Sequence, residues 1–191
     1  MTKKDIISLI ENDAWMMDIL SVVKTLELPD WWIGAGFIRS KVWDSLHGYT
    51  KRTPLPDVDV IYLNRNDYTK EEAQKGTTKK EVYYEQRLMK LRPEINWSVT
   101  NQARMHLFHD DKPYKTSEEA LAQWVETATC IGVKLDEDDN VVLATPRGID
   151  DLAHLILRPT PGAGKDTSTF ENRIRKKEWL KKWPKLKIII N

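Results

Sequence analysis

The segment from Trp31 to Leu63 constrains the fold of this chain more than any other. Its short apolar start ends at Gly34-Ala35-Gly36, which predicts a buried strand followed by a tight turn. The pattern from Phe37 to about Leu46 then predicts a helix. A polar loop leads from this helix into a second predicted strand at residues 57–63. The order of strand, turn, helix and strand indicates an α/β or α+β domain in which helices flank a small mixed sheet.

The second predicted strand begins with two carboxylates, Asp57 and Asp59. Alternate residues of a strand share one face, so both side chains would project side by side, about 6.6 Å apart along the strand. Two like charges this close repel each other unless a cation or hydrogen-bond donors relieve them. Mg²⁺ prefers oxygen ligands and commonly joins protein carboxylates to substrate phosphates. The pair therefore predicts a Mg²⁺ site, while a solvated pair or a cap is the common alternative for a lone Asp-x-Asp.

The turn at Gly34, Ala35 and Gly36 predicts the second half of such a site. A small-residue turn that opens a helix presents free backbone N–H groups and the positive end of the helix dipole, which together attract phosphate. Arg39, in the first turn of the predicted helix, adds a guanidinium suited to a forked contact with phosphate oxygens. Glycine is also the default residue of any tight turn. It is the order of the turn and the two acids that favours a phosphate and metal site.

Composition indicates one folded domain of 191 residues with 40% hydrophobic and 31% charged residues. We expect a core at about residues 13–110 and a C-terminal extension at about 111–191. Cys130 is the only cysteine, which excludes an intrachain disulfide and CxxC zinc sites. No apolar run approaches the roughly 20 residues that span a bilayer, and the N-terminus lacks a signal-peptide cleavage pattern, so we expect a cytoplasmic protein.

A basic segment at residues 173–187 stands out against a nearly neutral chain. It holds eight basic residues and one glutamate, a net charge of +7, so the rest of the chain carries −6 of the total of +1. Such a segment could face RNA or another anionic acceptor. The alternative is a helix with solvated lysines that packs inward through its apolar residues, which are Phe170, Ile174, Trp179, Leu180 and Trp183.

Periodicity and capping residues predict the remaining elements. Two N-terminal helices are separated near Asn12-Asp13, with Asp13 as a cap. Further helices are expected at residues 70–91, 101–106, from 116, from 148 and at 170–183. A strand is expected at 96–100, and a hairpin joins 128–135 to 141–144. The tryptophans Trp31, Trp32, Trp43 and Trp97 could stack a base, but tryptophans in apolar patterns more often belong to the core.

These motifs resemble a known superfamily. Ala35-Gly36-Phe37-Ile38-Arg39 resembles the Gly-Gly-x-Val-Arg segment in the head domain of CCA-adding enzymes, which extend the 3′ end of tRNA and belong to the nucleotidyltransferase superfamily of DNA polymerase beta. Residues 97–106, which include the run N-Q-A-R-M-H, together with 148–152 and Arg158-Pro159, resemble a family of stand-alone bacterial nucleotidyltransferase-like proteins. This second resemblance covers most of the chain.

The resemblance implies a Mg²⁺-dependent protein that binds a nucleoside triphosphate and transfers a nucleotidyl group to an acceptor hydroxyl. It assigns Asp57 and Asp59 to metal and catalysis, and Gly34, Ala35, Gly36 and Arg39 to the triphosphate. It further implies that Asn101 and Arg104 contact the nucleotide, with a helix-cap role for Asn101 as an equal alternative.

Three positions depart from the superfamily pattern: Ser98 stands where a third carboxylate is usual, Ser40 replaces an Asp after Arg39, and Ala35 replaces the first Gly. A hydroxyl is a poor Mg²⁺ ligand and no base at neutral pH unless activated. Glu94, Asn96 or Asp150 could substitute as a ligand. Two other functions therefore stay open. One is a catalytically silent nucleotide- or RNA-binding module. The other, less favoured because the apolar residues follow the acids, is an aspartyl phosphatase.

Overall fold

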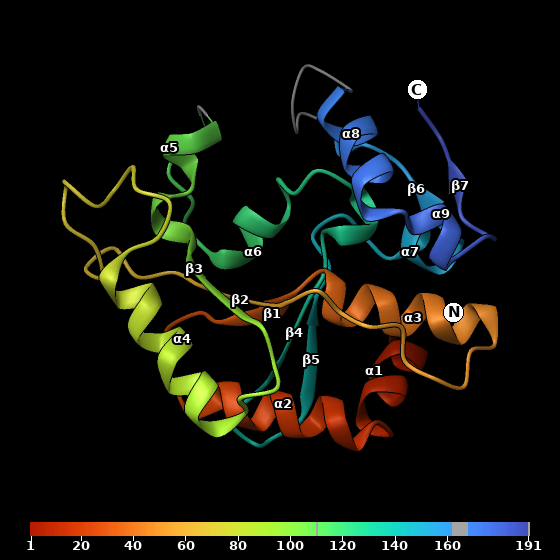
Figure 1. The fold of residues 1–191 in the computed structure, drawn as a ribbon, viewed down its shortest axis with the longest axis horizontal. Coiled ribbons are helices and arrows are strands. Elements are labelled where there is room, and N and C mark those ends of the chain that lie inside the picture. The colour runs from red at the N-terminus through yellow and green to blue at the C-terminus, as the bar shows by residue number, and fades with distance from the viewer. Residues whose placement is uncertain (110, 162–167, 191) are drawn as a thin grey trace.

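A five-stranded sheet in the order β3-β2-β1-β4-β5 forms the centre of the computed structural model, which describes residues 1–109, 111–161 and 168–190 (Figure 1). β2 and β3 run parallel, and the other neighbouring strands are antiparallel. The expected small mixed sheet is therefore confirmed, and so is the hairpin formed by β4 and β5. The strands are β1 (Trp32–Gly34), β2 (Val58–Tyr62), β3 (Trp97–Asn101), β4 (Gly132–Leu135) and β5 (Val141–Ala144).

Helices lie on both sides of this sheet. In Figure 1, α1, α2 and α4 lie on one side, while α5, α6, α8 and α9 lie on the other. The helices are α1 (Lys3–Glu11), α2 (Ala14–Lys24), α3 (Gly36–His47), α4 (Lys79–Leu91), α5 (His106–His109), α6 (Ser117–Leu121), α7 (Asp150–Ala153), α8 (Ser168–Lys177) and α9 (Trp179–Lys182). Short 3-10 turns, η1 (Gln102–Arg104) and η2 (Thr127–Thr129), and the strand pair β6 (Ile156–Leu157) and β7 (Lys187–Ile188) complete the chain.

The start of α4 corrects the helix expected at residues 70–91. The helix begins only at Lys79, because Thr78 and Glu81 form a reciprocal cap. The Glu81 backbone N–H donates to Thr78 Oγ1 at 3.2 Å, and the Thr78 N–H donates to Glu81 Oε2 at 2.7 Å. The Thr-x-x-Glu spacing carries this start signal in the sequence.

The last helix is also shorter than expected, since Glu178 separates α8 from α9 with a left-handed backbone, φ 52°. In one straight helix, Trp179 would lie about 140° around the axis from Ile174 and could not share its buried face. The break lets Trp179 and Trp183 pack edge to face against Trp43, with ring centroids 5.9 and 5.1 Å apart.

The expected inward packing of this region is confirmed for Phe170, Trp179 and Trp183, which are buried, and for Ile174, which is partly buried. It is wrong for Leu180, which is exposed. Two further differences from the expected structure concern secondary structure. Residues 127–129 form η2 where the first part of a strand was expected, and the short parallel pair of β6 and β7 was not predicted.

In the described ranges, no helix combines the length and the apolar character that crossing a membrane requires.

Candidate functional site

The two carboxylates stand together at the start of β2. Asp57 precedes the strand and Asp59 lies within it, both half-buried, and they alternate with the buried Val58 and Val60. Burial raises the pKa of Asp59, the negative charge of Asp57 raises it further, and a hydrogen bond from Ser98 opposes the rise. The ionised pair is therefore in electrostatic conflict, and a bound cation would relieve it. The assignment of these acids to metal stays a prediction.

The turn before α3 divides into three residues with different surroundings. Ala35 and Gly36 line a cleft of about 80 Å³ together with Asp57 and Asp59. Gly34 does not line it, because the Trp124 ring packs on Gly34 so closely that a Cβ there would lie 2.5 Å from Cη2 of that ring. At Gly36 a Cβ would meet only Arg39 Nη2, at 3.8 Å. Gly34 is thus required by packing.

Ala35 occupies a backbone conformation that favours glycine, with φ 33° and ψ −98°. It is the residue before α3, and no side-chain hydrogen bond caps the helix there. The first N–H groups of a helix lack the usual partner four residues earlier; here the Ile38 N–H donates to the Ala35 carbonyl at 3.2 Å, and Gly36, the first residue of α3, lines the cleft. This geometry suits a bound anion, with the strain of Ala35 located at the same point.

Arg39 lies beneath the cleft and is only 7% exposed. Its guanidinium carbon is 4.5 Å from the ring centroid of Trp179 and 5.1 Å from that of Trp43. Burial lowers the pKa of Arg39 to about 10, although the charge of Glu126 counteracts the fall, so the side chain stays cationic at neutral pH. Its Nε has no hydrogen-bond partner in the described parts of the chain. A buried cation with an unused donor favours an anionic ligand.

Three further cations line the cleft, and sequence reasoning did not assign them to it. Arg173 and Lys177 come from α8, and Lys182 comes from α9. Arg173 Nε is 2.7 Å from Oε1 of the buried Glu126, so part of its charge is already paired. The four-residue spacing of Arg173 and Lys177 could have indicated a shared helix face, but not what that face meets. The basic segment therefore both packs into the core and borders the acids.

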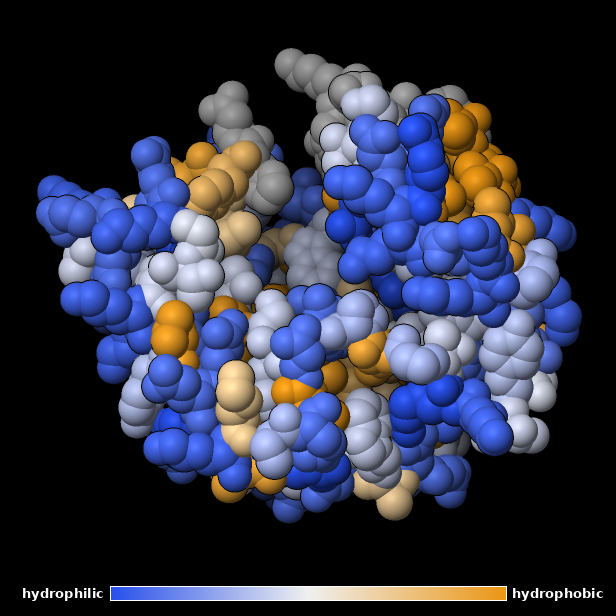
Figure 2. Space-filling model, in the orientation of Figure 1, coloured by the Kyte–Doolittle hydropathy of each residue, from blue (hydrophilic) through white to orange (hydrophobic). Residues whose placement is uncertain are grey.

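A second pocket, of about 170 Å³, adjoins the cleft and shares Asp59 and Trp124 with it. Its other lining residues are Ile61, Thr100, Gln102, Met105, Tyr114, Ala120 and Gln123. Figure 2 shows the surface hollowed between the part over α5 and the part over α8. Met105 of the second pocket precedes α5, while Arg173 and Lys177 of the cleft belong to α8.

A larger depression of about 420 Å³ lies between α1 and α3, away from the acids of β2. Its charges are nearly balanced, because Asp13 and Asp44 face Lys41, Lys51 and Arg52, and Asp13 pairs with Lys41 at 2.7 Å and with Arg52 at 2.8 Å. The smaller cleft has four basic residues against two carboxylates. Its larger excess of positive charge makes the smaller cleft the better candidate for binding an anion.

Ser98 takes the place expected for a third carboxylate, since it is the register partner of Asp59 in the parallel pair of β2 and β3. The proposed substitutes do not complete a cluster. Glu94 pairs with Arg92 at 2.6 Å, the Asn96 amide donates to the Pro56 carbonyl at 2.8 Å, and Asp150 lies in α7 outside the cleft. Accordingly, the described residues contain no group of three or more His, Cys, Asp or Glu arranged to hold a metal.

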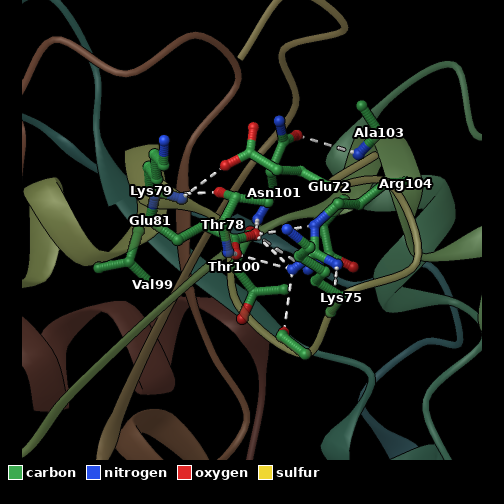
Figure 3. Close-up of polar contacts among 12 residues, drawn as sticks. Glu72, Lys75, Thr78, Lys79, Glu81, Val99, Thr100, Asn101, Ala103 and Arg104 are labelled. Atoms are coloured by element: carbon green, nitrogen blue, oxygen red, sulfur yellow. Dashed lines mark hydrogen bonds and ion pairs between the residues drawn. The ribbon is translucent and has the colours of Figure 1, made fainter. Parts of the chain in front are cut away.

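Asn101 and Arg104 lie at the opposite end of β3 from Ser98, in a buried network (Figure 3). Arg104 is fully buried, and it donates to Glu81 from Nη2 at 2.7 and 2.9 Å and from Nε at 3.2 Å, while the carbonyls of Lys75 and Gly76 accept from Nη1 and Nη2 at 2.6 and 3.1 Å. The Asn101 N–H donates to Glu81 at 2.7 Å. The Asn101 side chain accepts from Ala103 N and so caps η1. Neither side chain borders the cleft, so their contact with a nucleotide stays a prediction that this geometry does not favour.

The tryptophans considered for base stacking are core residues. Trp31, Trp32, Trp43 and Trp97 are all less than 9% exposed. The tryptophan that borders both pockets is Trp124, which is half-buried and follows α6. Only the fold reveals that it packs on Gly34.

The model of the nucleotidyltransferase family matches residues 21–188 of the chain. An NMR structure described as revealing a CCA-adding enzyme head domain has a TM-score of 0.83 and 28% identity, over 100% of this chain and 97% of that one. This structure therefore shares its fold with the whole of the present chain, including the β1–α3–β2 unit and β3. The chain belongs to the nucleotidyltransferase family.

Larger enzymes share the fold at lower identity. A CCA-adding enzyme with CTP has a TM-score of 0.57 at 11% identity, over 95% of this chain and 42% of that one. The Thermotoga maritima CCA-adding enzyme complexed with tRNA has a TM-score of 0.52 at 13% identity, over 91% and 38%. The chain therefore spans about two fifths of these two enzymes. A search of curated proteins found no match.

Proposed function

We propose that the protein binds a nucleoside triphosphate in the cleft between β2, α3 and α8 and transfers its nucleotidyl group to an acceptor hydroxyl. The observation that carries the proposal is one cleft that holds Asp57 and Asp59 opposite four basic side chains, beside the N-terminus of α3. Triphosphate needs cations and free N–H groups, and Mg²⁺ needs carboxylates. Both requirements meet in this cleft.

Mg²⁺ fits the donor set, because Asp57 and Asp59 are adjacent hard oxygen donors, and burial together with the charge of Asp57 raises the pKa of Asp59. These two residues would hold the ion. When bound, it would neutralise phosphate charge and help to orient the reacting groups. The protein's own cations divide the remaining work: Arg39 lies below the cleft, while Arg173, Lys177 and Lys182 border it from α8 and α9.

The transfer forms a bond between the acceptor oxygen and the α-phosphorus and breaks the bond from that phosphorus to the pyrophosphate leaving group. The hydroxyl proton has to pass to one of the two carboxylates or to water, since Ser98 is no base unless activated. We propose RNA as the acceptor. In support, α8 and α9 carry the exposed Arg175, Lys176 and Lys181, and one structural relative was solved with tRNA. A cytoplasmic location belongs to the same proposal.

Binding of each nucleoside triphosphate with Mg²⁺, measured by calorimetry on the full chain, tests the proposal. Asp59→Asn should abolish the Mg²⁺ dependence of binding, while Glu137→Gln removes one charge from the exposed hairpin tip and should change nothing. Lys177→Met should weaken binding about threefold or more, because a charge-assisted contact is lost. Lys176→Met, on the exposed side of α8, is its matched control. Absence of binding for all four nucleotides would refute the proposal.

A catalytically silent nucleotide- or RNA-binding module is the second candidate function, and Ser98 beside Asp59 is the observation that favours it. Ser98→Asp would restore a third carboxylate on the face of Asp59. If wild type incorporates labelled nucleotide into RNA and Asp59→Asn does not, the protein is not silent. If only Ser98→Asp incorporates it, the fold binds substrate but lacks one catalytic group.

A further inference from the structure

The second pocket is built on the same strand face as the acids. Asp59 and Ile61 of β2 are the register partners of Ser98 and Thr100 of β3, so these four side chains share one side of the sheet. Ile61 and Thr100 form the floor next to Asp59. The walls come from the η1 turn, from Tyr114 and from the end of α6 with Gln123 and Trp124. This pocket therefore continues the cleft across Asp59.

The two pockets differ sharply in charge. Among the described residues, Asp59 is the only charged one that lines the second pocket, whereas the cleft has four basic side chains besides its two acids. In place of charge, the second pocket offers two amides, from Gln102 and Gln123, and the aromatic ring of Trp124. Amides pair with the donor and acceptor edges of nucleobases, and aromatic rings provide a stacking surface.

The amides have hydrogen-bonding capacity to spare. Gln102 is only 4% exposed, and its amide makes one long hydrogen bond, 3.4 Å to the Thr100 carbonyl. The Gln123 side chain is half-buried and has no hydrogen-bond partner among the residues that the structure describes. Buried amide groups usually find partners. These two face a pocket in which a polar planar ligand would provide them.

We propose that the second pocket is the base-binding subsite of the nucleotide, with Gln102 and Gln123 as its hydrogen-bonding residues and Trp124 between base and phosphates. The inference rests on the proposed function and deepens it. A nucleoside triphosphate is itself divided into a charged end and an uncharged polar base, and the two pockets repeat that division on either side of Asp59 and Trp124. The alternative occupant is the end of the acceptor.

Tripolyphosphate and the four nucleoside triphosphates, each with Mg²⁺, separate the two pockets in a calorimetric titration of the full chain. Gln123→Ala should weaken the best-bound nucleotide about threefold to tenfold, the range for one lost hydrogen bond, and leave tripolyphosphate unchanged. Gln86→Ala, on the exposed face of α4, should change neither. Lys177→Met should weaken both ligands.

The outcomes separate this inference from the proposed function. If wild type binds nucleotides no more tightly than tripolyphosphate, or if Gln123→Ala and Gln102→Ala both leave nucleotide affinity unchanged, the base subsite is refuted while the phosphate site stands, and the pocket is left to the acceptor. If neither ligand binds wild type, the proposed function fails. Circular dichroism of each variant confirms that a loss of affinity is not a loss of fold.

Discussion

The two ends of the paired strands β2 and β3 treat buried charge in opposite ways. At one end, Arg104 and Glu81, each 1% exposed at the side chain, pair at 2.7 Å and share their other groups with backbone (Figure 3). At the other end, Asp57 and Asp59 repel each other, and Arg39 keeps a buried Nε without a partner in the described chain. At the first end, the buried charges are paired and hydrogen-bonded. At the second end, which borders the two pockets, they are not.

This difference in pairing helps to distinguish charged residues that stabilise the fold from charged residues that could bind a ligand. A buried ion pair whose donors and acceptors are all used has nothing left to offer a ligand, and its effect is to fix the loop at residues 64–78 against η1. Unpaired or repelling groups beside a pocket are destabilising unless something binds, which makes them candidates for function. Asn101 and Arg104 therefore differ from the Asp-x-Asp pair in what they leave free for a ligand, although the resemblance suggested a site role for all four residues.

The largest effect on stability is expected from removing the buried ion pair between Arg104 and Glu81. Arg104→Met should lower the free energy of unfolding by about 3–5 kcal/mol, because it leaves Glu81 as an uncompensated buried charge. Urea denaturation followed by tryptophan fluorescence measures the change. Arg158→Ala, which breaks a partly exposed pair with Asp151, should cost only about 1 kcal/mol or less.

The double variant Arg104→Met/Glu81→Gln tests the cause of that loss. Gln removes the charge and keeps an acceptor for the Thr78 N–H, but its NH2 group would then face the Asn101 N–H, so the double variant should recover only part of the lost stability. Where the variants remain folded, their nucleotide affinity should equal that of wild type. A selective loss of affinity in the folded protein would instead support a direct contact between Arg104 and the nucleotide.

A smaller loss is expected from the glycine that packs against Trp124. Gly34→Ala should destabilise the protein by about 1–3 kcal/mol, since its Cβ would lie 2.5 Å from the ring and overpack the sheet. It should also displace Trp124 and weaken ligands of both adjoining pockets. Gly36→Ala is the matched control, because its Cβ meets nothing closer than 3.8 Å. Equal losses for the two variants would contradict a packing role specific to Gly34.

A gain of about 1 kcal/mol is expected for Ala35→Gly, because glycine adopts the φ of 33° without the steric cost of a Cβ. Thermal unfolding measures it, and Ala122→Gly, in the ordinary right-handed region after α6, should lose stability. If Ala35→Gly is also destabilising, the turn is not strained.

Sequence reasoning predicted the β1–α3–β2 unit, β3 and the β4–β5 hairpin, because their periods and caps are local. The resemblance put Ser98 at the usual position of a third carboxylate on a neighbouring strand, and the register pairs Ser98 with Asp59. Sequence reasoning could not predict that Lys177 and Lys182 border the acids, since that depends on Glu178 turning the chain between α8 and α9. For the same reason Gln123 and Trp124 remained unassigned: contacts of high sequence separation are set by the fold, and no local pattern records them.

The smallest effect on stability is expected at Asp59, where a substitution should stabilise the metal-free protein, whereas Arg104→Met should destabilise it. Burial and Asp57 raise the pKa of Asp59 above 3.8, so the fold favours its protonated form. The metal-free wild type should then lose stability as pH rises from about 3.8 through the raised pKa, because the unfolded chain releases the proton more readily. Asp59→Asn cannot ionise, so it should be more stable than wild type at pH 7, by up to about 1 kcal/mol, and equal to it below pH 3.8.

Added Mg²⁺ should stabilise wild type alone and reverse the order of the two stabilities, since only wild type has both carboxylates to bind the ion. Denaturation at pH 3 and pH 7, with and without Mg²⁺, measures all four values. A variant that is less stable than wild type without metal would mean that Asp59 holds the fold together as Arg104 does, and the contrast between the two ends of β2 and β3 would be lost.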